Sequence, residues 1–361
     1  MKTTKQWVTK IGALLLAGVM SAAFPVNAYA DTVTKGVVIS DYGPVAGDKP
    51  QEQNNSVSET EAGENATQSM AENHPAGTSD SVSKGTENNS TALGTGNGFF
   101  TTEKTTVPNV GSNYAILVNA DTNEIIVAKN ATERFNPASM TKVMTLLVAC
   151  EHVSDLKKNV TITQDIVDYV QTNGASHVGF KAGEVVSVQD LLYGLILPSG
   201  ADAALALTRL IAGSEENFVV LMNQKAQALG IAGTTHFTNT TGLYNEQHYS
   251  TPKDIATIMN AASKNDLARA VLSAVHYTTG ANAKHSTGIA LTNLFLSRIA
   301  QKATGGIVNL AKTGYIAKAG NCSVSAFTAA SGTHYIAVTG KAQGVWNCIN
   351  DHVTLYSTYA R

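Results

Sequence analysis

The stretch Asn136-Pro137-Ala138-Ser139-Met140-Thr141-Lys142 leads into an apolar run that ends at Cys150. This run predicts a buried helix over residues 140–150. Residues three apart share one face of a helix, so the side chains of Ser139 and Lys142 are expected to meet where the helix starts. Burial lowers the pKa of a lysine, and a neutral lysine can take the proton of a serine hydroxyl. The spacing therefore indicates a serine nucleophile with a lysine base and no histidine.

The Ser-x-x-Lys spacing alone is a weak signal, because a serine that only caps a helix gives the same pattern. It occurs three more times, at Ser81/Lys84, Ser154/Lys157 and Ser250/Lys253. The first lies in a polar segment, the second in a polar loop after a helix, and the third beside Pro252, where a helix is expected to begin. Ser139 alone of the four serines stands directly before an apolar helix.

A second motif, Lys312-Thr313-Gly314, occurs once and far downstream. One reading is a strand that ends in a turn. The other is a strand edge where glycine lets a substrate backbone approach closely. A lysine and a threonine hydroxyl at such an edge suit a terminal carboxylate.

The first 107 residues differ in character from the rest of the chain. Residues 1–30 have three lysines, an apolar stretch and Ala28-Tyr29-Ala30, which predict a cleaved signal peptide and export, against the alternative of an uncleaved anchor. Residues 31–107 are polar, with eleven acidic residues against four lysines, and predict a disordered linker. The expected location is extracellular or at the cell envelope.

Residues 108–361 form the expected catalytic domain. They hold eighteen basic and sixteen acidic residues without a basic run, which gives no reason to expect a nucleic-acid partner. Short strands are predicted near both ends and helices between them, which indicates an α+β fold whose two ends share one antiparallel sheet. The predicted strands are 114–119, 125–129, 310–313, 322–329 and 335–339, and the predicted helices are 140–150, 189–197, 202–211, 216–229 and 344–359.

The segment from Asn113 to Gly340 resembles the D-alanyl-D-alanine carboxypeptidase family of low-mass penicillin-binding proteins, which are serine peptidases of the penicillin-recognising superfamily. The resemblance implies a β-lactamase/transpeptidase-like fold, with a five-stranded antiparallel sheet flanked by helices and an all-helical lobe. It rests on order and spacing as well as on the two motifs. The matching text is Ala115 to Thr122, Asn136 to Lys142, Leu191 to Gly194, Leu197 to Gly200, Phe237 to Asn239, Gly242-Leu243, His248 to Thr251, Lys312 to Tyr315 and Ala319 to Cys322.

The resemblance also implies a reaction and its residues. Ser139 attacks the penultimate D-alanine of a peptidoglycan stem peptide ending in D-Ala-D-Ala, and Lys142 is its base. Ser199 relays a proton to the leaving nitrogen, and Lys312 polarises that network. Lys312, Thr313 and Gly314 line the substrate-binding site. The backbone N–H groups of Ser139 and Tyr315 form the oxyanion hole. β-Lactam antibiotics acylate the same serine, and the reaction needs no metal or other cofactor.

One position departs from the family pattern. The second motif is usually Ser-x-Asn, but here it is Ser199-Gly200-Ala201. Ala201 supplies no amide to hold the lysine base or a substrate carbonyl, and an ionised Asp202 donates no hydrogen bond in its place. Activity is still expected, at a reduced rate or with an altered preference.

Four alternatives share these motifs. A transpeptidase or an endopeptidase uses the same acyl-enzyme with another acceptor or substrate. A β-lactamase of class A needs a Glu-x-x-Leu-Asn segment, which the sequence lacks. A catalytically impaired wall-binding protein is suggested by Ala201. There is no Gly-x-Ser-x-Gly or His-Glu-x-x-His, and His177 reads as a loop residue.

The cysteine count is odd. The chain has Cys150, Cys322 and Cys348, so at least one thiol is unpaired. Cys150 reads as a small buried apolar residue. We expect Cys322 and Cys348 to stay unpaired as well, since one is placed on a strand and the other on a helix.

Overall fold

The computed structural model describes residue 107 and residues 109–361. The predicted signal peptide, nearly all of the predicted linker and the pair Ser81/Lys84 lie outside these residues. Among the described helices, none is long and apolar enough to cross a bilayer.

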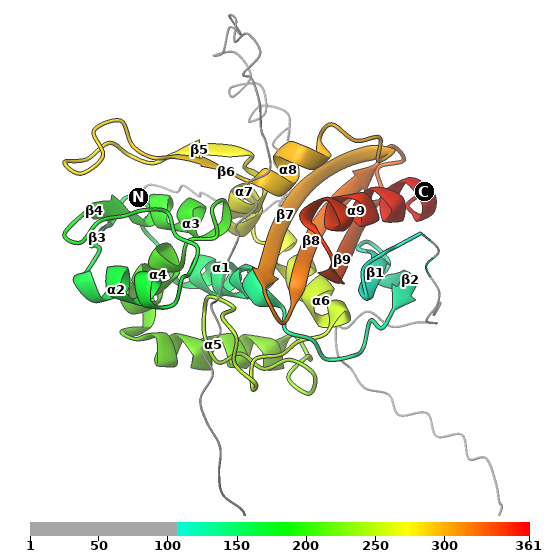
Figure 1. The fold of residues 1–361 in the computed structure, drawn as a ribbon, viewed down its shortest axis with the longest axis horizontal. Helices are drawn as coiled ribbons and strands as arrows, with labels where there is room; N and C mark the ends of the chain where they lie inside the picture. Colours follow the sequence, from blue (N-terminus) through cyan, green and yellow to red (C-terminus); the bar gives the residue numbers. More distant parts are fainter. Residues whose placement is uncertain (1–106, 108) are drawn as a thin grey trace, which may run out of the picture. The chain divides into compact units, whose positions relative to one another are not determined.

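A five-stranded antiparallel sheet joins the two ends of the described chain (Figure 1). Its order is β2-β1-β9-β8-β7. The first hairpin is β1 (Tyr114–Asn119) and β2 (Glu124–Lys129), and the last three strands are β7 (Gly306–Ile316), β8 (Gly320–Ala329) and β9 (His334–Ala342). The predicted α+β class and shared sheet are confirmed. The predicted strands at 310–313 and 335–339 were too short, because the ladder continues past each apolar centre.

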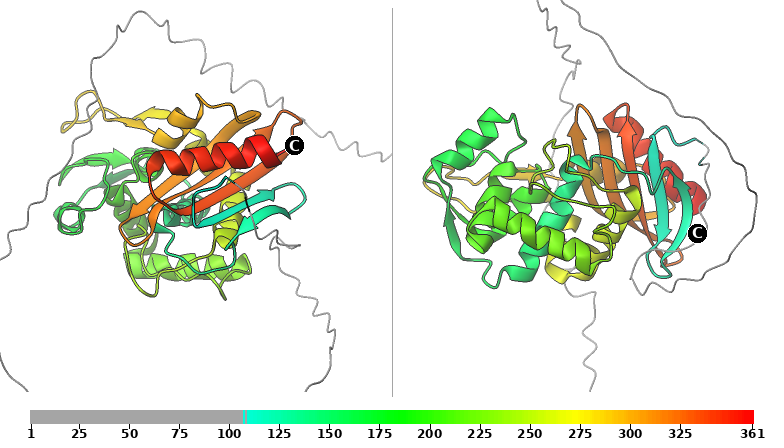
Figure 2. Two further views of the ribbon diagram at one scale, coloured as in Figure 1. Left: turned by 45° about the vertical axis from the view of Figure 1, so that its right-hand side comes forward. Right: turned by 90° about the horizontal axis from the view of Figure 1, so that it is seen from below.

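Alternate residues of each strand face different layers, as the pleat of a strand requires. Ala115 and Leu117 pack toward the C-terminal helix α9 (Val345–Tyr359), whereas Ile116 and Val118 join the main core. Figure 2 shows α9 along one face of the sheet. The helix α8 (Leu294–Ile299) packs against α9 on this face, and most of the other helices lie beyond the opposite face. Strand β7, which carries Lys312 to Gly314, is one of the two edges of this sheet, and β2 is the other.

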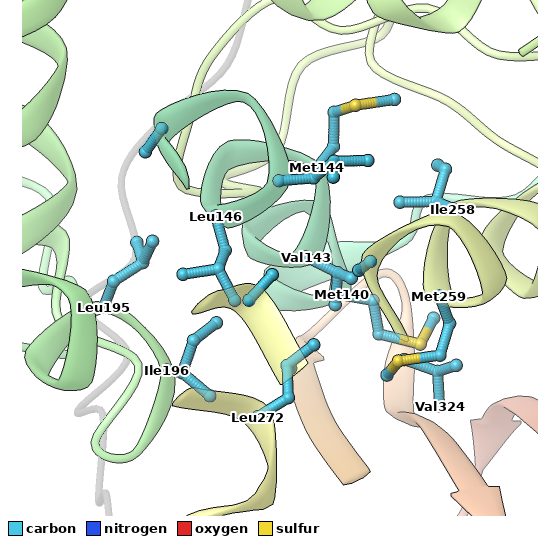
Figure 3. Packing of buried hydrophobic residues seen from close by; sticks show 14 of the residues in the cluster. Met140, Val143, Met144, Leu146, Leu195, Ile196, Ile258, Met259, Leu272 and Val324 are labelled. Atoms are coloured by element: carbon cyan, nitrogen blue, oxygen red, sulfur yellow. The ribbon is translucent and has the colours of Figure 1, made fainter. Parts of the chain in front are cut away.

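The helix after the nucleophile motif is the centre of the main core. The short 3-10 helix η1 (Ala138–Met140) leads into α1 (Thr141–His152), nearly all of which is buried. In Figure 3, Met140, Val143 and Leu146 lie among side chains from several other elements. These partners include Leu195 and Ile196 of α3 (Val188–Ile196), Ile258 and Met259 of α6 (Pro252–Lys264), Leu272 of α7 (Asp266–Ser273) and Val324 of β8. Packing from all sides fixes the start of α1.

A second, mainly helical layer lies away from the sheet. Besides α3 it contains α2 (Gln164–Thr172), α4 (Ala201–Ala212) and α5 (Glu215–Ala228), with two short antiparallel pairs at its border. These are β3 (Asn159–Thr161) with β4 (Val185–Ser187), and β5 (His276–Thr278) with β6 (Ala290–Thr292). The short helix α8 (Leu294–Ile299) follows β6 and leads toward β7. The sequence predicts no bounds for α2, α6, α7 and α8 or for these short strands, although it predicts that a helix begins at Pro252.

Candidate active site

The predicted nucleophile lies on the turn that starts α1. Ala138 has a φ of 47°, in the left-handed region, and Ser139 follows it half-buried. Lys142 is 2% exposed, and its Nζ atom lies 3.2 Å from Oγ of Ser139. The residue spacing therefore brings base and nucleophile into hydrogen-bond reach, as predicted.

The surroundings of Lys142 favour its neutral form. Burial lowers its pKa to about 7, although the negative charges of Asp202 and Glu215 act in the opposite direction. The Nζ atom also donates a hydrogen bond of 2.7 Å to the backbone carbonyl of Thr241. At neutral pH a substantial fraction of such lysines is unprotonated and able to accept a proton.

The second predicted pair faces the first from other elements. Ser199 lies in the turn between α3 and α4 with a φ of 65°, and its Oγ accepts a hydrogen bond of 3.0 Å from Nζ of Lys312 on β7. The same ammonium donates to the carbonyl of Thr313 at 2.8 Å. Burial, with the positive charge of Lys142 added to it, holds the pKa of Lys312 well below its usual range.

Strand β7 passes directly beside the nucleophile. An ideal Cβ atom on Gly314 would lie 2.9 Å from the backbone nitrogen of Ser139 and 3.0 Å from Cβ of Ala138. Glycine is therefore required for this approach. Thr313 is exposed toward solvent, and Tyr315 directly after the glycine is 64% exposed.

These groups line one cavity of about 610 Å³, within the size range of small-ligand sites. Ser139, Ser199 and residues 312–315 all contribute to its wall. The wall has two charged residues, Lys312 and Arg298, and both are basic. Arg298 comes from α8, and its guanidinium lies 5.7 Å from the ring centre of Trp346. A cavity with this charge suits a ligand that carries a carboxylate.

The departure at the second motif has a structural counterpart. Ala201 is fully buried and packs in a small apolar cluster with Val170 and Ala175. Asp202 does not replace the absent amide, because its carboxylate accepts hydrogen bonds from the backbone nitrogens of residues 178–180 and of Ala203.

The backbone carbonyl of Thr241 contacts Lys142, and the sequence does not predict this contact. Phe237 to Asn239 and Gly242-Leu243 carry part of the family resemblance, which implies no role for Thr241. A backbone oxygen leaves no side-chain signal in the sequence. The available signal was Asn239 three residues before Gly242, a spacing typical of a turn built by an asparagine side chain.

The remaining predicted features make none of the serine–lysine contacts, although Cys322 and Cys348 line the same cavity. Cys150, Cys322 and Cys348 are free and buried, which confirms the expectation of unpaired thiols. Burial raises the pKa of each thiol. His177 lies exposed in a loop, as expected. The described part of the chain contains no group of three or more His, Cys, Asp or Glu side chains arranged to hold a metal ion.

A serine and lysine pair, a second such pair opposite and a glycine-bearing strand edge define a class of acyl-transferring serine enzymes. Comparison with known proteins agrees with this class. The family model described as D-alanyl-D-alanine carboxypeptidase, peptidase family S11, matches residues 100–344. The chain belongs to this family.

The similar proteins are named either D-alanyl-D-alanine carboxypeptidase or DD-transpeptidase. The chain is 39% identical over 142 residues to the D-alanyl-D-alanine carboxypeptidase DacF of Bacillus subtilis, and 36% identical over 180 residues to a D-alanyl-D-alanine carboxypeptidase of Streptomyces sp. strain K15. These matches cover 39% and 48% of this chain, but 36% and 62% of the relatives. Among solved structures, the Streptomyces K15 DD-transpeptidase matches with a TM-score of 0.63 and 30% identity, over 70% of this chain and 98% of that one.

Proposed function

We propose that the chain is a serine-type D-Ala-D-Ala carboxypeptidase that removes the terminal D-alanine from peptidoglycan stem pentapeptides. The proposal is carried by the two serine–lysine pairs that meet at one cavity, with Nζ–Oγ distances of 3.2 Å for Lys142–Ser139 and 3.0 Å for Lys312–Ser199. Family membership supports the same substrate class.

In the proposed acylation step, neutral Lys142 takes the hydroxyl proton of Ser139 while Oγ attacks the carbonyl carbon of the penultimate D-alanine. The backbone N–H groups of Ser139 and Tyr315 stabilise the oxyanion that forms. Removal of one such donor costs about two to three orders of magnitude in rate. The position of Gly314 beside the Ser139 nitrogen supports this assignment, because it brings the two backbone segments together.

The leaving D-alanine needs a proton on its nitrogen when the peptide bond breaks. Ser199 relays to it the proton that Lys142 took from Ser139, so that both side chains return to their starting protonation state. Lys312 next to Ser199 stabilises the network and, with Thr313, binds the terminal carboxylate. The basic wall of the cavity supports this role. Water then attacks the ester on Ser139 and releases the shortened stem peptide.

The direct test is incubation of the purified protein with a stem pentapeptide and identification of the products by mass. We expect release of one D-alanine, and loss of this release in Ser139→Ala. Labelling by a fluorescent penicillin without any release of D-alanine would instead indicate a wall-binding protein that acylates but does not turn over.

A second candidate function is transpeptidation, since one structural relative is titled a DD-transpeptidase. The two activities share the acyl-enzyme and differ in the acceptor. Adding a stem peptide with a free side-chain amine to the same assay separates them, because a transpeptidase joins the two peptides. Rapid hydrolysis of penicillin would instead indicate a β-lactamase.

We further infer that the protein is exported, with residues 1–30 removed and residues 31–107 left as a polar segment before the catalytic domain. The supporting observations are the basic start, the apolar stretch and the Ala28-Tyr29-Ala30 sequence. Sequencing of the mature protein is expected to begin at Asp31, and a mature chain that begins at Met1 would contradict cleavage.

A further inference from the structure

Residues 239–243 form a turn that presents a backbone carbonyl to the lysine base. The carbonyl oxygen of Thr241 lies 2.7 Å from Nζ of Lys142, closer than Oγ of Ser139 at 3.2 Å. We call these five residues the base-holding turn. The position of the Thr241 carbonyl therefore helps to fix where Nζ of Lys142 lies relative to Oγ of Ser139.

The side chain of Asn239 holds this turn together. Its Oδ1 atom accepts hydrogen bonds from the backbone nitrogens of Thr241 at 3.2 Å and Gly242 at 2.7 Å, and from the hydroxyl of Thr241 at 3.2 Å. Its Nδ2 atom donates to the carbonyl of Leu243 at 3.0 Å. One side chain thus fixes the residues on both sides of the Thr241 carbonyl.

Two further contacts fix the turn against the helix that carries Lys142. The hydroxyl of Thr145, one turn further along α1, donates to the carbonyl of Thr240 at 2.8 Å. Gly242 has a φ of 81° and approaches η1 so closely that a Cβ atom would lie 1.9 Å from the carbonyl oxygen of Ala138. The turn, the nucleophile and the base are therefore parts of one packed unit.

We propose that Asn239 is a positioning residue for the reaction, which holds the Thr241 carbonyl so that Lys142 stays aligned with Ser139. The proposal rests on the proposed function. It explains how the base is oriented although the second motif offers no amide. Ala201 lies in an apolar cluster, and Asp202 is bonded to the loop at residues 178–180, so neither competes for Lys142 as a hydrogen-bond partner.

Charged groups from three elements lie near Lys142. Asp202 on α4 and Glu215 on α5 favour the protonated form of Lys142. The positive charge of Lys142 in turn lowers the pKa of Lys312 on β7. Asn239 is uncharged. Its replacement by aspartate keeps an acceptor for the three donors of the turn and adds a negative charge near the base.

The test is the rate of Ser139 acylation by a fluorescent penicillin as a function of pH. In Asn239→Ala the turn loses its acceptor, and we expect the maximal rate to fall roughly 10- to 100-fold, as a small misplacement of a reacting group does. The acid limb of the profile, where the rate rises as Lys142 loses its proton, should also move to lower pH. The protonated lysine loses a well-aligned carbonyl acceptor, which lowers its pKa. In Asn239→Asp the limb should move to higher pH by roughly half a unit or more.

The matched control is Asn245→Ala, two residues beyond the turn. Asn245 is exposed and caps only the backbone nitrogen of Gln247. Its replacement should leave both the rate and the acid limb unchanged. A purely structural role for Asn239 predicts losses that follow the melting temperature and an acid limb that stays in place in both variants, and that result would overturn the proposal. If the unaltered protein is not acylated at all, the proposed function fails instead.

Discussion

Gly314 and Ser139 approach so closely that a Cβ atom on the glycine would lie 2.9 Å from the serine nitrogen. Gly314→Ala should therefore displace β7 from the nucleophile turn and separate the two backbone segments proposed for the oxyanion. We expect penicillin acylation to fall by about two orders of magnitude. The control is Gly233→Ala, where an added Cβ meets nothing within 4 Å. Equal acylation rates in the two variants would show that the close approach is not needed.

The rate of acylation should depend on pH through Lys142. Its pKa of about 7 means that the active, neutral form increases as the pH rises through 7. Glu215 favours the protonated form, so Glu215→Gln should lower this pKa and move the acid limb to lower pH. The amide oxygen still accepts the bonds that Glu215 receives from Thr240. A limb that moves to higher pH would contradict the assignment of Lys142 as the base.

Arg298 and Lys302 provide a matched pair of cations. Both lie over the ring of Trp346, at 5.7 and 5.4 Å, but only Arg298 lines the cavity. If the basic wall attracts the substrate carboxylate, Arg298→Ala should raise KM roughly tenfold with little change in kcat. Lys302→Ala should leave both constants unchanged. An equal effect of the two substitutions would point to general surface charge.

Acid should destabilise the fold through His352. This side chain of α9 is fully buried, and its ring nitrogens contact the hydroxyls of Ser323, Ser325 and Thr339. Burial lowers its pKa to about 3. The unfolded chain takes up the proton near pH 6.5 and the folded chain does not, so stability falls with each pH unit between about 6.5 and 3, by about 1.4 kcal/mol per unit.

Denaturant unfolding at several pH values checks this expectation. His352→Gln should be less stable at pH 7 and should show a flatter decline in acid, because the titrating group is gone. The exposed loop residue His177 provides the control, since His177→Gln should leave the measured slope unchanged. An unchanged slope in the His352 variant would exclude this residue as the cause.

Much of the fold could be predicted because its pattern is local. The apolar run after Lys142 predicts α1, and β1 was placed at its observed bounds, 114–119. The helices α2 and α7 have only nine and eight residues, and the strands of the second layer have three, so each is too short to show a clear period. Their positions depend on contacts with distant residues, such as the bond from Tyr277 to buried Asp190.

The candidate site also contains a part that the sequence predicts and a part that it does not. Ser139, Lys142, Ser199 and residues 312–315 were named from spacing and resemblance, and the structure brings them together. The base-holding turn was not predicted, because its contact with Lys142 is made by a backbone oxygen. The apolar environment of Ala201 was also invisible, since Val170 and Ala175 reach it only through the folding of α2 and the loop after it.

The order of the strands has a consequence for how the chain acquires its structure. Strand β9 lies between β1 and β8, so the first hairpin is joined to β8 and β7 only by the strand that follows the other four in the described chain. More than 200 residues separate the paired positions Tyr114 and Gly340. Such long-range pairing makes folding slow and late. A chain cut before residue 334 retains Ser139, Lys142 and Lys312 but lacks the strand that joins β1 to β8. The five-stranded sheet beside the nucleophile therefore cannot close before β9 has been synthesised.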